Sequence, residues 1–276
     1  MAERHGIHPT KALGQHFLVD PNLARRIAEL AEVGRGDAVL EIGAGLGSLT
    51  VALAATGARV LAVEFDRSLE PALREVLAEA GAGAVEVVIA DAMKMDWPSA
   101  LAGAERWTMA SNLPYNVATP LVLELLASVP QIDTFLVMVQ REVGERLAAD
   151  PGDEGYGAVS VKVALRADAE ILRRVPASVF WPAPKVASVL VRLRRLSEPR
   201  VTVDPDLLFR VVDEGFAQRR KMMRNALRRL GLAPSEADRA LEQAGIPPGS
   251  RAEEIALAGF ARLAETLRER GVLEDG

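Results

Sequence analysis

The chain has 276 residues, of which 49% are apolar and 26% charged, the composition of an ordinary globular protein. It contains no cysteine, which excludes disulfides, thiolate metal sites and cysteine nucleophiles. Its three histidines, His5, His8 and His16, all lie in the first sixteen residues, so the rest of the chain offers no Ser-His-Asp triad and no histidine metal site. We therefore expect no bound metal, and a chemistry that uses carboxylates, amides, backbone groups, aromatic rings or a cofactor.

The chain lacks the pattern of a membrane span. Its longest charge-free stretches, such as residues 42–58, are about seventeen residues long and are interrupted by glycine. The N-terminal residues are charged and lack an apolar core segment, which argues against a signal peptide. We expect a cytoplasmic protein.

The hydrophobic periodicity predicts alternating strands and helices after an irregular arm over residues 1–20. The expected strands are 38–42, 59–65, 85–90, 107–111, 135–139, 171–175 and 186–193, and the expected helices begin at 21 and span 46–55, 68–80, 120–128, 141–149 and 158–166. This alternation predicts the α/β class, with a mostly parallel sheet and helices on both faces. Residues 197–205 contain two prolines and few apolar residues, so we expect an α/β domain over 1–199 and a small all-helical domain over 200–276.

A glycine-rich turn joins the first expected strand to the next helix. In Glu41-Ile-Gly43-Ala-Gly45-Leu-Gly47 the glycines let the backbone approach a ligand closely. Glu64 and Asp91 end the next two strands, and ligands of open α/β sheets bind at the carboxyl ends of strands. Glu64 has the right reach to accept ribose hydroxyls, and Asp91 to accept an adenine amino group. We therefore predict a nucleotide-type site.

Two cofactors compete for this site. Nicotinamide dinucleotides require the spacing G-x-G-x-x-G, but here the third glycine comes one residue early and Ser48 stands where that pattern needs glycine. The spacing E-x-G-x-G-x-G is the pattern of methyltransferases that use S-adenosylmethionine (AdoMet). A hydride-transferring enzyme also lacks a histidine acid in the body of the chain.

The segment Asn112-Leu113-Pro114-Tyr115 follows a strand at the same edge of the sheet. An exocyclic amino group is a poor nucleophile because its lone pair is delocalised into the ring. Acceptors on the Asn112 side chain and the Leu113 carbonyl, the latter held extended by Pro114, would pull such a nitrogen toward tetrahedral geometry. Tyr115 would stack on the base, and Phe180, on a proline-stiffened loop, would cover its other face.

Charge is unevenly distributed. Residues 162–229 carry 16 Lys/Arg against 7 Asp/Glu, and the remainder carries 17 against 31. The densest part, residues 218–229, has six cations in twelve residues, which suits a phosphate backbone and equally suits the solvated face of a basic helix. The sequence leaves these two interpretations open.

Five segments in this order resemble the ribosomal RNA adenine dimethyltransferases, most closely the KsgA family, which acts on the small subunit. They are Lys11-x-x-Gly14-Gln15-His16-Phe17-Leu18, residues 41–47, Asn112-Leu-Pro-Tyr-Asn-Val-Ala-Thr-Pro120, Phe180-Trp-Pro-Ala-Pro-Lys-Val-Ala-Ser188 and Phe216-Ala-Gln-Arg-Arg-Lys221.

The resemblance implies that residues 1–199 form a Rossmann-like AdoMet-binding catalytic domain and that 200–276 contact ribosomal RNA or the subunit. It implies two methyl transfers to N6 of each of two adjacent adenosines near the 3′ end of 16S rRNA during biogenesis of the 30S subunit. The expected AdoMet contacts are His16, Leu18, Gly43, Gly45, Glu64, Asp91, Ala92 and Asn112. Asn112, Leu113, Pro114, Tyr115 and Phe180 are expected to hold the adenine, and Arg219, Arg220, Lys221, Arg224 and Lys185 the RNA. We expect a monomer whose partner is the 30S subunit or its precursor.

One residue departs from the family pattern, because His16 stands where asparagine is usual. An imidazole cannot offer a donor and an acceptor in the geometry of an amide, and it introduces the hypothesis of pH-dependent AdoMet binding. Two alternatives remain: a large-subunit adenine methyltransferase that confers antibiotic resistance, and a ribosome-assembly factor without catalysis.

Overall fold

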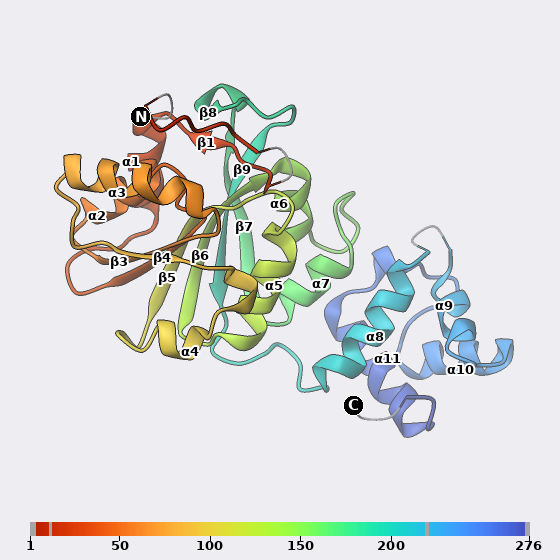
Figure 1. Cartoon of the computed structure of the whole chain (residues 1–276). Helices are drawn as coiled ribbons and strands as arrows, with labels where there is room; N and C mark the ends of the chain where they lie inside the picture. Colours follow the sequence, from red (N-terminus) through yellow and green to blue (C-terminus); the bar gives the residue numbers. More distant parts are fainter. Residues whose placement is uncertain (1–3, 11–12, 219–220, 274–276) are drawn as a thin grey trace. The chain divides into compact units, whose positions relative to one another are not determined.

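The structure, a computed structural model, describes residues 4–10, 13–218 and 221–273. It divides the chain into two compact units (Figure 1). The first comprises residues 1–144 and 169–195, and the second 145–168 and 196–276. The expected domain of residues 1–199 includes 145–168, whereas in the structure this segment belongs to the second unit.

The first unit is built on a seven-stranded sheet with the order β4-β3-β2-β5-β6-β9-β7. The strands are β2 (Ala38–Ile42), β3 (Arg59–Glu64), β4 (Glu86–Ile89), β5 (Trp107–Asn112), β6 (Ile132–Gln140), β7 (Ala167–Val175) and β9 (Ser188–Arg195). Strands β2 to β6 pair in parallel and β9 is antiparallel to β6. The predicted α/β class with a mostly parallel sheet is confirmed. Because β2, β3, β4 and β5 run in the same direction, their carboxyl ends meet at one edge.

Helices cover both faces of this sheet (Figure 1). On one face, α1 (Pro21–Leu30), α2 (Ser48–Ala54) and α3 (Glu70–Glu79) pack through apolar side chains such as Ile27, Leu53 and Leu73. On the other face, α4 (Trp97–Ala100) and α5 (Ala118–Ser128) follow the sheet, and α6 (Arg141–Leu147) continues from β6. Asp20 caps α1 by accepting from the backbone N–H groups of Asn22 and Leu23.

Two short strands form a second sheet that the periodicity does not predict. Strand β1 (Phe17–Leu18) pairs antiparallel with β8 (Phe180–Trp181), with Phe17 opposite Trp181 and Leu18 opposite Phe180. Part of the expected irregular arm is therefore a strand, and its pairing with β8 holds the N-terminal segment against the loop before β9.

The second unit is helical around its own apolar core, which includes Leu208, Leu227, Leu241 and Phe260. Its helices are α7 (Ala158–Ala164), α8 (Pro205–Phe216), α9 (Met223–Arg229), α10 (Pro234–Gln243) and α11 (Leu257–Glu269). The expected helical C-terminal part is confirmed. Residues 218–229, for which a basic helix face was one of the two open interpretations, do not form one helix, because α8 ends at Phe216 and α9 begins only at Met223. Among the described residues, no helix has the length and apolar character needed to span a membrane.

Candidate active site

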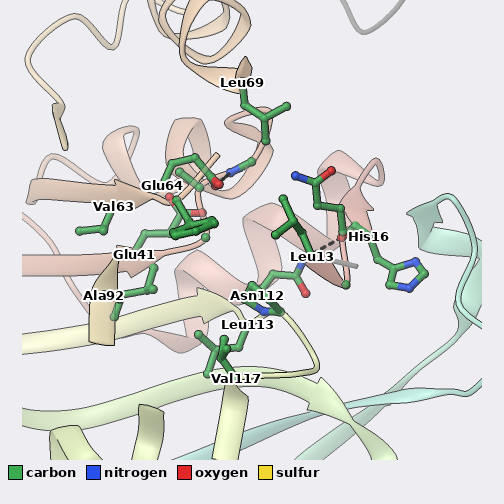
Figure 2. A pocket seen from close by; sticks show the side chains of 18 of the residues that line it. Leu13, His16, Glu41, Val63, Glu64, Leu69, Ala92, Asn112, Leu113 and Val117 are labelled. Carbon is green, nitrogen blue, oxygen red and sulfur yellow. Dashed lines mark hydrogen bonds between the residues drawn. The ribbon is translucent and has the colours of Figure 1, made fainter. Parts of the chain in front are cut away.

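A cavity of about 350 Å³ opens at the carboxyl ends of β2, β3, β4 and β5, all within the first unit (Figure 2). The structure brings all eight predicted cofactor contacts together in its lining: His16, Leu18, Gly43, Gly45, Glu64, Asp91, Ala92 and Asn112. Leu113, Pro114 and Tyr115 line it as well. Figure 2 shows Glu41 and Glu64 on one side, with Asn112 and His16 approaching from another.

The glycine turn forms the floor of this cavity because the neighbouring chain leaves no room for side chains. Gly43, Gly45 and Gly47 all have positive φ angles, between 56° and 85°. A Cβ atom on Gly43 would lie 3.3 Å from Cδ of Pro114 and 3.4 Å from the Asn112 carbonyl oxygen. A Cβ atom on Gly45 would lie 3.0 Å from Cδ1 of Phe17. The glycines therefore let the turn, the Asn-Leu-Pro-Tyr segment and the N-terminal arm converge.

Glu64, at the end of β3, is oriented by backbone groups. Its Oε2 accepts from the N–H of Gly45 and its Oε1 from the N–H of Asp66, both at 2.8 Å. Its side chain is buried, and burial raises its pKa while these backbone hydrogen bonds act in the opposite direction. Each carboxylate oxygen has two lone pairs, so both oxygens retain capacity to accept hydroxyl groups of a ligand.

Glu41, at the start of the glycine motif, also lines the cavity and is only 1% exposed. Its Oε2 is buried without a hydrogen-bond partner. Burial raises its pKa to about 8, with Glu64 adding to the shift and Thr50 opposing it. Glu41 is not among the predicted site residues, although a charged residue inside the apolar run Ala38–Ile42 is a signal that could have identified it.

Asp91, after β4, accepts from the N–H of Met93 at 3.0 Å and lies 3.4 Å from Nζ of Lys94. It stands one strand beyond Glu64, as the sequence predicted from strand order. Gln15, another lining residue that was not selected, donates to Asp66 at 2.7 Å and thereby connects the arm to the end of β3.

Asn112 is held by the N-terminal arm. Its Nδ2 donates to the backbone carbonyl of His16 at 2.9 Å, drawn as a dashed line in Figure 2. This contact fixes the orientation of the amide, so that Oδ1 is its acceptor end. The N–H of Leu113 donates to the Met138 carbonyl at 3.1 Å, which anchors the segment to β6.

Tyr115 and His16 form an aromatic pair beside Asn112. Their ring centroids are 5.2 Å apart with an interplanar angle of 32°. The Tyr115 hydroxyl shares a hydrogen bond of 2.8 Å with Oγ of the buried Ser188, and burial raises the pKa of Tyr115. Nδ1 of His16 is 2.7 Å from the Pro182 carbonyl oxygen, so it carries the donated proton. His16 thus connects the arm to the loop after β8.

Phe180 is the predicted site residue that the structure does not bring into the cavity. Its side chain is 3% exposed and packs in the apolar core with Leu18 and Ile27. It does not line the cavity, because the pairing of β8 with β1 turns it inward and turns the next residue, Trp181, outward.

The predicted RNA contacts are distributed over both units. Lys185 is exposed on the loop before β9, and Lys221 is exposed before α9. Arg224 is half-buried, and its Nε donates to the Pro248 carbonyl at 3.1 Å and lies 3.6 Å from Asp238. Arg219 and Arg220 lie outside the described residues.

The chain matches known proteins over nearly its full length. Residues 8–269 match the family model of ribosomal RNA adenine dimethylases. A protein of Rhodococcus opacus called ribosomal RNA small subunit methyltransferase A is 48% identical, over 96% of this chain and 91% of the relative. A protein of Cutibacterium acnes with the same name is 44% identical, over 100% and 94%.

Solved structures agree with this match. A dimethyladenosine transferase from Plasmodium falciparum has a TM-score of 0.78 and 25% identity, covering 93% of this chain and 98% of its own. The 23S rRNA methyltransferase ErmE has a TM-score of 0.68 and 29% identity, covering 91% and 99%. The chain belongs to the ribosomal RNA adenine dimethylase family.

Proposed function

We propose that this chain transfers methyl groups from AdoMet to N6 of two adjacent adenosines near the 3′ end of 16S rRNA, during biogenesis of the 30S subunit in the cytoplasm. The observation that carries the proposal is the fixed amide of Asn112. Its Nδ2 is engaged by the His16 carbonyl, so its Oδ1 is the acceptor end, beside a cavity that also holds two strand-end carboxylates.

The residues of the cavity fit AdoMet. Glu64 keeps lone pairs for ribose hydroxyls, and Asp91 is the next acceptor along the sheet edge for an adenine amino group. The glycine turn leaves room where Cβ atoms would meet Pro114 and Phe17. AdoMet, when bound, supplies a methyl group on a positively charged sulfur. The raised pKa of Glu41 leaves that carboxyl protonated and uncharged at neutral pH, so Glu41 does not supply a counter-charge to the sulfur.

The chain's own residues would act on the nucleophile. Oδ1 of Asn112 and the Leu113 carbonyl would accept hydrogen bonds from the adenine N6 amino group, which draws its lone pair out of the ring. Pro114 holds the backbone, and Tyr115, fixed through its hydroxyl by Ser188, would stack on the base. Phe180 would reach the base only if it left its core position. The rate gain comes from orientation and electrostatics and requires no histidine or cysteine.

The choice of subunit rests on the relatives. The curated relatives that carry the small-subunit name are 43% to 48% identical, whereas ErmE, named for 23S rRNA, is 29% identical. We propose that a monomer binds the 30S subunit or its precursor and that its phosphate contacts are Lys185, Arg219, Arg220 and Lys221. Arg224 contributes less, because its guanidinium already donates to the Pro248 carbonyl.

The test is methyl transfer from labelled AdoMet to isolated small and large ribosomal subunits that lack these modifications. Label recovered from the small subunit as N6,N6-dimethyladenosine supports the proposal. Label on the large subunit would instead identify the chain as a large-subunit adenine methyltransferase of the kind that confers antibiotic resistance. Absence of label on both, with AdoMet still bound, would favour an assembly factor.

A further inference from the structure

Trp181 is the one tryptophan of this chain that is substantially exposed. The sequence contains three tryptophans, and the structure describes all of them. Trp97 is 5% and Trp107 1% exposed, whereas Trp181, on β8, is 41% exposed. A tryptophan side chain is large, flat and mostly apolar, so an exposed one on an ordered strand offers a ring face on which a ligand can stack.

The Trp181 ring is held in place at the edge of the active site. Its ring stacks on Phe17 with centroids 6.0 Å apart and an interplanar angle of 27°. Phe17 is buried and lines the cavity against Gly45. The residue after Trp181, Pro182, accepts the hydrogen bond from His16, another lining residue. Trp181 is therefore separated from the cavity by a single layer of side chains and is preorganised by the β1–β8 pairing.

The loop that carries Trp181 has the charge of a nucleic-acid contact. The segment from Phe180 to Ser188 contains Lys185 and no acidic residue. Lys185 and Val186 are exposed. The loop therefore carries an exposed aromatic ring and, four residues later, an exposed cation. Sites for single-stranded nucleic acid combine these two groups, with the ring stacking on a base and the cation contacting a phosphate.

We propose that Trp181 stacks on the base of the nucleotide next to the target adenosine. This inference rests on the proposed function and adds a residue to it. An adenosine that enters the cavity leaves its neighbour without a stacking partner, and an aromatic ring outside the cavity replaces that partner. Each adenosine has one neighbour on either side, and because the two targets are adjacent, one of these neighbours is the other target.

Three variants separate stacking from packing. Trp181→Phe keeps an aromatic face, Trp181→Leu keeps apolar contact with Phe17 without such a face, and Trp181→Ala removes both. We expect kcat/KM for unmodified small subunits to fall roughly tenfold in the Leu and Ala variants and to stay within about threefold in the Phe variant. The Kd for AdoMet should not change in Trp181→Leu. An unchanged Kd would show that the N-terminal arm still lines the cavity. Ile171→Ala, at another exposed apolar residue of this unit, is the matched control and should behave as wild type.

Fluorescence tests the contact directly. The accessible emission of the chain comes from Trp181, so a short single-stranded RNA with two adjacent adenosines should quench it in the wild type and not in Trp181→Phe. Equal kcat/KM in all variants, or wild-type emission unchanged by saturating RNA, would overturn the proposal. If the wild type methylates no small subunit, the proposed function fails, and the quenching experiment alone decides whether Trp181 stacks.

Discussion

Asn112 is the residue on which the proposed chemistry depends most. Its substitution by alanine removes the Oδ1 acceptor and the hydrogen bond to the His16 carbonyl. We expect methyl transfer to fall by about two orders of magnitude or more, since loss of one preorganised polar group in an active site has an effect of that size. The Kd for AdoMet, measured by calorimetry, should stay within several-fold. Retained turnover would contradict the acceptor role.

Glu41 gives the chain a characteristic dependence of stability on pH. Its pKa is about 8 in the folded chain and near the ordinary value of 4.5 when unfolded, so between these values the folded state holds a proton that unfolding releases. The contribution of Glu41 to the free energy of unfolding is therefore present below pH 4.5 and is lost as the pH rises toward 8.

Glu41→Gln should remove this dependence. Relative to the wild type, the variant should gain roughly 1 kcal/mol of unfolding free energy per pH unit between about pH 5 and pH 7. Urea denaturation at several pH values measures the difference. Glu124→Gln, at an exposed position on α5, is the control and should follow the wild-type profile. A pH-independent difference between Glu41→Gln and the wild type would contradict the assignment of a buried protonated carboxyl.

Residue identity and strand order together made much of the cavity predictable. Glu64 ends β3, Asp91 follows β4 and Asn112 ends β5, and parallel strands of one sheet bring such ends to one edge. The orientations of Phe180 and Trp181 could not be predicted in this way. The register of β8 against β1 decides which of these two adjacent aromatic residues turns inward. That register is set by a pairing of residues more than 160 positions apart, which local sequence does not encode.

At the scale of elements, Arg195 at the end of β9 closes the C-terminus of α5. Its guanidinium donates to the carbonyls of Leu125, Leu126 and Val129, and its Nε donates to Ile132, at 2.7 to 3.0 Å. The Leu125 and Val129 carbonyls also accept from the backbone N–H groups of Val129 and Ile132, so the arginine adds a charged donor to carbonyls at the negative end of the helix dipole.

Arg195→Met keeps the apolar stem and removes the donors. We expect a loss of about 2 kcal/mol in the free energy of unfolding, because several partly buried carbonyls lose a charged partner. The neighbouring Arg194 is exposed and pairs with Glu32 at 3.3 Å, so Arg194→Met should cost less than about 1 kcal/mol. Urea midpoints of the two variants provide the comparison, and equal midpoints would contradict the capping role.

Elements with strong periodicity matched their predictions closely. The expected helix over 120–128 is α5 (Ala118–Ser128), and the expected strand over 59–65 is β3 (Arg59–Glu64). The segment before α9 was harder, since its cations and its apolar residues at helical spacing suit a continuous helix. Instead, Met222 pairs with Arg251 in an isolated bridge, and the Met223 N–H donates to the Ser250 carbonyl. These contacts come from a distant part of the chain and override the local pattern.

At the scale of the whole molecule, the excess of positive charge over residues 162–229 opposes the net charge of −5. Several of these cations are already engaged within the protein. Arg229 donates to the Glu214 carboxylate at 3.0 Å, and Lys162 lies 2.8 Å from Asp213. The number of cations that contact phosphate is therefore smaller than the sequence count, and the salt dependence of binding measures it.

Replacing Arg219, Arg220 and Lys221 together by glutamine should weaken binding to the small subunit and flatten its salt dependence. Each phosphate contact contributes about 0.7 to 0.9 to the slope of log K against log salt concentration, so three lost contacts should reduce the slope by about 2. Arg229→Gln, which removes a cation paired with Glu214, is the matched control and should leave the slope unchanged. The slope is obtained from subunit-binding titrations between low and moderate salt. If the triple variant kept the wild-type slope, these cations would be solvated and other residues would contact the phosphates. Lys185, on the loop that carries Trp181, would then be the next residue to replace.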